Sequence, residues 1–264
     1  MDINNIASSF QSLLSNGGST YDLLRIAAHF RRLELEKQLY SHLNGIVADG
    51  PFKGMSYLPS AHASTLSPKL TGTYEKEIQE DLLAIANSVN SFLDIGCAEG
   101  YYTTGLALIP NISCVVGVDI NNESLKAAQI LADLNKVSKK CFFTTRIDQA
   151  VNKLSGISLI MIDVDGSEID VIRNIFACAS EELLRLSYFL IETDYHSSGN
   201  SNRNEIIDEF QIRGFKVLKE IKQDPSERIS TVAQKYTQSF LDLAIYGMEG
   251  RPANQSWLIF KAAL

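Results

Sequence analysis

The sequence predicts an α/β protein with a doubly wound, mostly parallel seven-stranded sheet, helices on both faces of the sheet and an N-terminal helical extension. After residue 90, short runs rich in β-branched and aromatic residues alternate with segments of helical periodicity. Most of these runs are apolar throughout, which is typical of parallel strands covered on both faces. The last run, SWLIFKAAL, is expected to pair antiparallel beside the run that precedes it.

The expected strands all follow residue 90. They are residues 91–95, 113–120, 141–145, 158–164, 187–193, 215–221 and 256–264. The helices expected after residue 90 lie between them, at residues 101–109, 122–135, 146–154, 167–179 and 202–213.

The region before the first strand has a different organisation. Residues 1–20 contain the polar stretch SNGGS and predict a weakly ordered start, whereas apolar residues recur with helical spacing over 21–43. Residues 50–72, called the lead-in below, hold three prolines and show no periodicity, and a helix is expected over 74–88. We therefore divide the chain into an N-terminal extension with the lead-in (1–72) and a cofactor-binding domain (73–264).

Composition restricts the classes of partner. The formal net charge is −7, so long-range repulsion disfavours phosphate backbones and we expect no nucleic-acid partner. No apolar stretch reaches the roughly 18 residues of a membrane span, and no membrane partner is expected. The four cysteines show no zinc-ligand spacing and the N-terminus has no signal-peptide pattern, so a cytoplasmic location is expected.

One motif carries the chemistry. The first strand runs into Asp94, Gly96, Ala98, Glu99 and Gly100, and a helix begins directly afterwards. In this strand–loop–helix arrangement a nucleotide lies across the ends of the strands, and the glycines allow the backbone a close approach.

The next strand ends in a carboxylate followed by an apolar residue, Asp119-Ile120. A carboxylate at this position can accept both hydroxyls of a ribose. The loop departs from the GxGxxG pattern of dinucleotide-binding proteins, and the Glu99 carboxylate would repel a pyrophosphate. S-adenosyl-L-methionine has no phosphate and brings an ammonium and a sulfonium, so the charge pattern favours it as the cofactor.

The segments FLDIGCAEG and GVDI resemble motifs I and II of class I S-adenosylmethionine-dependent methyltransferases, which have a Rossmann-like fold. The resemblance implies that Gly96, Ala98 and Gly100 line the methionine and ribose and that Asp119 binds the ribose diol. It also implies a contact of Asp148 with the adenine amino group, with a helix N-cap role as the alternative.

A second resemblance concerns the fourth strand. Residues 162–168, IDVDGSE, are similar to the DvEGaE motif of the FkbM-type subfamily, whose members are largely O-methyltransferases. The stretch 50–75 is also similar to the segment that precedes the first strand in FkbM-like bacterial proteins. Asp165 and Ser167 replace the usual glutamate and alanine of that motif, which are mild departures.

Acceptor-side groups are expected at the ends of the fourth and fifth strands. Asp163, Glu192 and His196 are the catalytic candidates, since a hydroxyl acceptor needs a general base or a metal. His196 is a candidate general base, and the alternative is a solvated loop histidine without a role. Asp163 is expected to orient the acceptor or to contact the cofactor, and the alternative is the cap of a helix. These residues and Asp165 offer ligands for a divalent cation, as an alternative to a general base. The general base is the preferred interpretation, so no metal is predicted.

Three functions remain open at this point. The predicted function is O-methylation of a hydroxyl on a small molecule or saccharide. The alternatives are N-methylation of a protein or nucleic acid, disfavoured because a [DN]PP[YF] signature is missing, and a cofactor-binding interaction module without catalysis. His62, Tyr57 and Tyr74 are candidates for a lid over the acceptor. The helix over 21–43 is expected either to cover the site or to pack against a second subunit in a homodimer.

Overall fold

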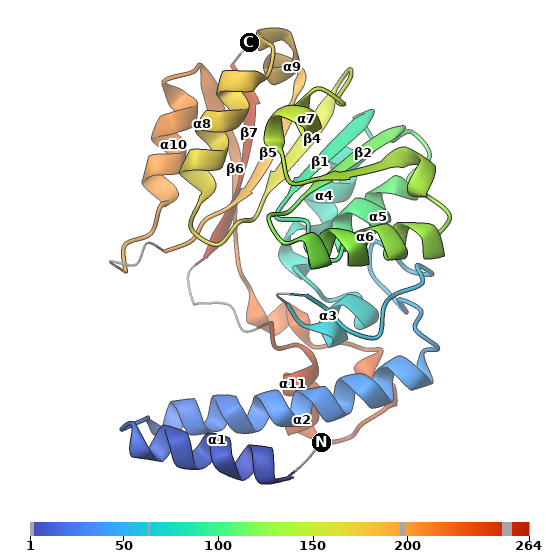
Figure 1. Ribbon diagram of the computed structural model, residues 1–264, viewed down its shortest axis with the longest axis vertical. Helices are drawn as coiled ribbons and strands as arrows, with labels where there is room; N and C mark the ends of the chain where they lie inside the picture. The colour runs from blue at the N-terminus through green and yellow to red at the C-terminus, as the bar shows by residue number, and fades with distance from the viewer. Residues whose placement is uncertain (1–2, 63, 196–198, 250–254, 264) are drawn as a thin grey trace.

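A computed structural model of the protein describes residues 3–62, 64–195, 199–249 and 255–263 (Figure 1). Its centre is a seven-stranded sheet of order β3-β2-β1-β4-β5-β7-β6. Strands β1 to β5 are parallel, and β7 pairs antiparallel with both β5 and β6. This confirms the predicted fold class. The strands are β1 (Ser91–Ile95), β2 (Cys114–Val118), β3 (Cys141–Thr144), β4 (Ser158–Ile162), β5 (Tyr188–Glu192), β6 (Phe215–Lys222) and β7 (Ser256–Ala262).

Helices cover both faces of the sheet because successive strand residues point to opposite sides. On one face, Phe92 and Val115 belong to a cluster with residues of α4, α5 and α6. On the other, Leu93 and Val116 belong to a cluster with residues of α7, α8 and α10. The helices of this layer are α4 (Gln79–Ala86), α5 (Tyr101–Ala107), α6 (Asn122–Leu134), α7 (Ile147–Val151), α8 (Glu168–Cys178), α9 (Glu181–Leu186) and α10 (Arg203–Gln211).

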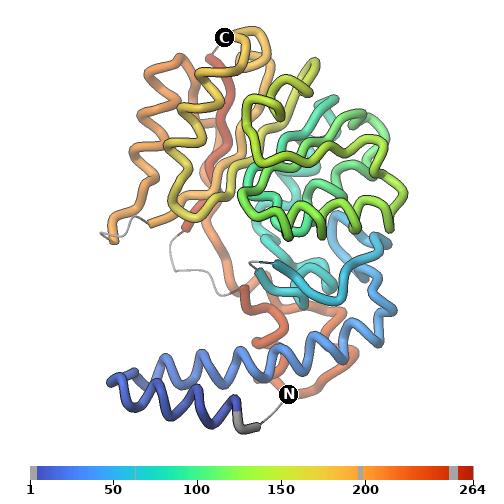
Figure 2. The backbone as a smooth tube through the Cα atoms, viewed as in Figure 1, coloured from blue at the N-terminus to red at the C-terminus, as the bar shows by residue number. Residues whose placement is uncertain are grey.

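A helical cap lies beyond one end of the sheet (Figures 1 and 2). It consists of α1 (Ile3–Ser15), α2 (Thr20–His42) and α11 (Phe240–Tyr246). Helix α2 contacts both α1 and α11, and the Arg31 guanidinium pairs with the Asp242 carboxylate at 2.8 Å. The N-terminal helices therefore lie beside a segment about 200 residues further along the chain.

The weakly ordered start predicted for residues 1–20 is wrong, because α1 occupies most of it. Its apolar residues Ile6, Phe10 and Leu13 are half-buried, and α1 packs against α2. Ser19 begins α2 with a reciprocal cap, in which its hydroxyl accepts from the Asp22 N–H and the Asp22 carboxylate accepts from the Ser19 N–H. The SNGGS stretch is thus the turn between two helices.

The lead-in also contains more structure than its composition predicts. Helix α3 (Leu66–Thr71) is fully buried, and Leu66 and Ser67 donate their N–H groups to the Glu36 carboxylate of α2. The helix expected over 74–88 is a short 3-10 turn, Lys76–Ile78, followed by α4. The predicted division at residue 72 stays a prediction, and α2 contacts elements on both sides of it.

A long excursion joins the last two strands. Lys222 at the end of β6 pairs with Ser256 at the start of β7, and residues 223–255 lie between them. Helix α11 and two 3-10 turns, Pro225–Arg228 and Ala233–Lys235, belong to this excursion. None of the helices that the structure describes combines the length and apolar character needed to span a membrane.

Candidate functional site

The loop from Gly96 to Gly100 joins β1 to α5 at the carboxyl edge of the sheet. Gly96 and Gly100 have φ angles of +89° and +84°, which favour glycine. A Cβ on Gly96 would lie 1.7 Å from the Asp163 carbonyl oxygen, and one on Gly100 would lie 3.0 Å from the Ala128 Cβ. These glycines therefore let the loop pass close to the end of β4 and to α6, a reason within the protein itself that sequence analysis did not foresee.

Asp119, at the end of β2, fixes this loop. One carboxylate oxygen accepts the Ala98 N–H at 2.9 Å and the other accepts the Asn121 N–H at 2.7 Å. Ala98 is held in the left-handed region, φ +46°, a strained conformation that is frequent at functional sites. A carboxylate offers about four lone-pair positions, so Asp119 retains capacity to accept hydrogen bonds from a ligand.

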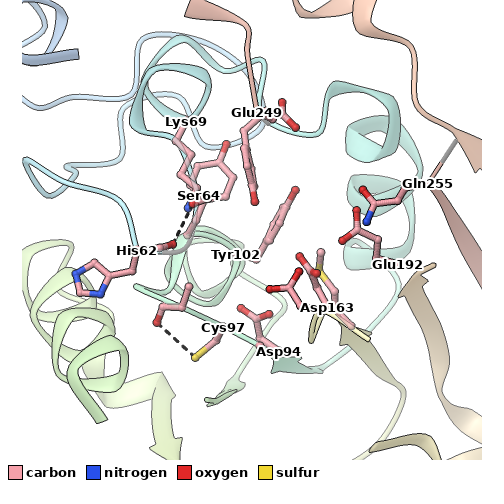
Figure 3. Close-up of a pocket in the computed structure, with 16 residues that line it drawn as sticks. His62, Ser64, Lys69, Asp94, Cys97, Tyr102, Asp163, Glu192, Glu249 and Gln255 are labelled. Carbon is pink, nitrogen blue, oxygen red and sulfur yellow. Dashed lines mark hydrogen bonds between the residues drawn. The ribbon is translucent and has the colours of Figure 1, made fainter. Parts of the chain in front are cut away.

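A cavity, called the cofactor cavity below, opens beside this loop where β1 lies between β2 and β4 (Figure 3). Ligands bind in this crevice of doubly wound sheets because the strand order changes direction there. Asp94, Asp163 and Glu192 line it from the ends of three adjacent strands, β1, β4 and β5. Asp165, with φ +51°, and Glu249 add two further carboxylates to its wall.

Burial shifts the ionisation of two of these acids. The pKa of Asp94 rises to about 7, chiefly through burial and also through the nearby Asp163 charge, although the Thr103 hydroxyl donates to its carboxylate at 2.6 Å. Burial raises the pKa of Glu249 to about 8 despite the Arg228 guanidinium 3.2 Å away. A cationic ligand would favour the charged form of both groups, so the cavity suits a ligand with positive charge.

The cofactor cavity is covered by the lead-in. His62, Ser64 and Lys69 line it, together with Tyr74 just beyond the lead-in. Glu99, fully buried, accepts from Lys69 Nζ at 2.6 Å, the Tyr57 hydroxyl at 2.5 Å and the His62 N–H at 3.0 Å. Burial alone would raise the pKa of Glu99, but the Lys69 charge and hydrogen bond hold it below its usual value.

Residues 86–172, which include this loop and the ends of β1 to β4, match a family model described as a methyltransferase domain. The match covers 87 of the 264 residues, about a third of the chain. The methyl donor of such a domain is S-adenosyl-L-methionine, as the sequence predicted. Its ammonium and sulfonium fit the acidic wall of the cavity, whereas the contact of its ribose hydroxyls with Asp119 stays a prediction. No curated protein matches the sequence.

Solved structures share the fold at low identity. The ribosomal protein L11 methylase of Lactobacillus delbrueckii subsp. bulgaricus is 14% identical, with a TM-score of 0.46, over 72% of this chain and 79% of that one. Precorrin 8W decarboxylase of Methanobacterium thermoautotrophicum is 15% identical, with a TM-score of 0.44, over 71% and 90%. The tRNA methyltransferase TrmK (M1A22) of Bacillus subtilis is 11% identical, with a TM-score of 0.42, over 69% and 65%.

The expectation of no nucleic-acid partner is corrected by this comparison, because structures of similar fold include a tRNA methyltransferase. The expectation rested on the net charge of −7, which describes the whole surface. A substrate meets only one face, and charge on that face can differ in sign from the total. We therefore withdraw the exclusion.

Several predicted site residues, Gly100 and Asp119 among them, do not line the cofactor cavity. The Glu99 carboxylate faces donors of the lead-in, as described above. Ile120 is 94% exposed, and Asp148 is half-buried, with its side chain 46% exposed and its carboxylate paired with Arg146 at 2.7 Å. His196 lies outside the described residues. The cofactor and catalytic roles assigned to individual residues stay predictions.

Other residues of the cavity wall were missed by sequence reasoning. Lys69, Tyr102, Glu249 and Gln255 line the cavity, but their positions follow no motif or spacing. Of the residues on the lead-in side, the sequence predicted only His62, Tyr57 and Tyr74 as a cover. His62 and Tyr74 line the cavity, whereas Tyr57 donates its hydroxyl to Glu99. Among the described residues no group of three or more His, Cys, Asp or Glu side chains is arranged to hold a metal ion.

Proposed function

We propose that the protein transfers the methyl group of S-adenosylmethionine to a hydroxyl oxygen of a small molecule or saccharide. The single observation that supports it most is the presence of two acceptor-side carboxylates, Asp163 and Glu192, in the same cavity as the Gly96–Ala98 loop. The similarity of residues 162–168 to the FkbM-type motif also supports O-methylation and membership of that subfamily.

The residues that would hold the cofactor follow the ends of β1 and β2. Asp119 accepts hydrogen bonds from the ribose hydroxyls, and the backbone from Gly96 to Ala98 lies against the sugar and methionine. Asp94 and Asp163 attract the ammonium. When bound, the cofactor supplies a methyl group attached to a positively charged sulfur.

The acceptor side then needs alignment, exclusion of water and a proton acceptor. Glu192 is buried at the end of β5 and Asp163 is half-buried after β4, so a hydroxyl between them donates its proton to a carboxylate oxygen. Tyr74 and Tyr102, both buried, provide an apolar wall that excludes water from the reacting oxygen. His196 is a second candidate for the base.

We also infer a cytoplasmic location. Cys97, Cys114, Cys141 and Cys178 are all free thiols, the state typical of proteins in a reducing compartment.

Binding and transfer are tested separately. Calorimetry with S-adenosylhomocysteine should show saturable binding, and a labelled methyl donor should then reveal transfer to hydroxyl compounds, saccharides included. Absence of binding would overturn the whole proposal. Transfer to nitrogen of a protein or nucleic acid, with none to oxygen, would overturn the acceptor assignment alone.

Three variants test the acceptor side. Glu192→Gln, Asp163→Asn and His196→Ala are each expected to lower turnover by at least about tenfold, because a general base typically contributes about 10²- to 10⁴-fold. Affinity for S-adenosylhomocysteine should stay unchanged in Glu192→Gln and His196→Ala. Glu182→Gln, an exposed glutamate in α9, is the matched control. A variant with normal turnover removes that residue from the mechanism.

A further inference from the structure

A second cavity of about 340 Å³, called the basic cavity below, adjoins the cofactor cavity. It lies between α2 and the lead-in, and its volume falls within the range of small-molecule sites, about 300–1,000 Å³. Ser64 and Glu249 line both cavities, so the two are neighbours across one wall. In Figure 3 both residues lie near Lys69, on the lead-in side of the cofactor cavity.

Three basic side chains of α2 face this second cavity. Arg25, His29 and Arg32 are spaced four and three residues apart, which places them on one face of the helix. Arg32 Nη2 lies 3.1 Å from His29 Nδ1, so His29 accepts there and its Nε2–H is a donor. Within the described part of the chain Arg25 makes no ion pair.

The groups opposite α2 add a donor and little opposing charge. Thr65 is 3% exposed and lines the cavity, and among described residues its hydroxyl has no hydrogen-bond partner. Glu36, 3.7 Å from Arg32, accepts the N–H groups of Leu66 and Ser67, and Glu249 pairs with Arg228. The carboxylates nearby are therefore already engaged by groups of the protein.

We propose that the basic cavity binds an anionic group, a phosphate or carboxylate, of a small-molecule acceptor whose hydroxyl lies in the cofactor cavity. This inference rests on the proposed function. Arginine forms charge-assisted hydrogen bonds to both anions, and the hydroxyl and histidine donors complete a site for several oxygens. Because the cofactor cavity is acidic and the basic cavity is cationic, such an acceptor would bind in a single orientation.

The experiment uses the full-length protein with inorganic phosphate and, in a second arm, succinate, each titrated by calorimetry. Both anions should bind saturably, and the double variant Arg25→Gln/His29→Gln should bind them roughly tenfold more weakly. Both residues are exposed, so the fold should be retained, which a thermal melt checks. Lys37→Gln, an exposed lysine on the same helix, removes one charge outside the cavity and should leave anion binding unchanged.

S-adenosylhomocysteine binding separates the two proposals. If the wild-type protein binds no S-adenosylhomocysteine, the proposed function fails whatever the anions do. If S-adenosylhomocysteine binds normally but phosphate and succinate bind equally to wild type and the double variant, the basic cavity is not an anion site. Displacement of phosphate by an oligoribonucleotide, with the same dependence on Arg25 and His29, would overturn the small-molecule acceptor.

Discussion

The edge of the sheet and the cover above it form opposite walls of one site, but they are built differently. The edge consists of Asp94 to Gly100 and Asp119, within 26 residues of the chain, and hydrogen bonds between neighbouring strands hold it. The cover combines the lead-in with Glu249 and Gln255, almost 200 residues away, and a buried ion pair, Lys69–Glu99, fixes the lead-in to the edge. One wall of the site is thus encoded locally, whereas the opposite wall depends on long-range packing.

The largest expected effect is on the attachment of the cover. Lys69→Met leaves the buried Glu99 carboxylate without its ion-pair partner, and breaking a buried pair costs about 3 to 5 kcal/mol. Urea titration should show that loss in the free energy of unfolding. The double variant Lys69→Met/Glu99→Gln should recover part of it, because no buried charge remains. A single variant as stable as wild type would mean that the cover is held by other contacts.

The next effect concerns the edge. Asp119→Ala removes the acceptor that holds the Ala98 N–H and the predicted partner of the ribose hydroxyls. We expect S-adenosylhomocysteine to bind roughly a hundredfold more weakly, equivalent to the loss of one or two charge-assisted hydrogen bonds. Calorimetry measures this directly. Unchanged affinity would show that the nucleoside does not contact Asp119.

The third prediction tests the buried acid at the base of the site. The raised pKa of Asp94, about 7, exceeds the roughly 3.9 of an unfolded aspartate, so between these values the folded protein binds more protons. The free energy of unfolding of the cofactor-free protein should therefore fall as pH rises from about 4 to about 7. Asp94→Asn should make this fall smaller by about 2 kcal/mol, in urea titrations at pH 5 and pH 7.5. Parallel pH profiles for the two proteins would contradict a buried, titrating Asp94.

The smallest effect is expected at Asp148, which serves as a matched aspartate variant for Asp119. Its carboxylate is exposed and paired with Arg146, so Asp148→Ala should weaken S-adenosylhomocysteine binding by less than about threefold. The same calorimetric titration applies. A tenfold or larger loss would restore the adenine contact that the family resemblance implies.

Predictability from sequence follows the same division. The strand SFLDI was predicted with its observed bounds, Ser91–Ile95, because buried parallel strands require continuous apolar residues. Helix α11 was missed, since its short apolar stripe becomes helical by packing on α2 from the far end of the chain. Lys69 gave no signal either, because a lysine is normally exposed and only the folded position of Glu99 explains its burial.

The pairing of Lys222 with Ser256 has a consequence for the diversity of such proteins. The chain leaves the sheet after Lys222 and returns to it at the paired residue Ser256, so residues 223–255 take the place of a hairpin loop between β6 and β7. Replacing them by a shorter or longer stretch would shift the register of no strand. Variation in that stretch would therefore alter the part of the cavity wall formed by Glu249 and Gln255 and leave the loop after β1 unchanged.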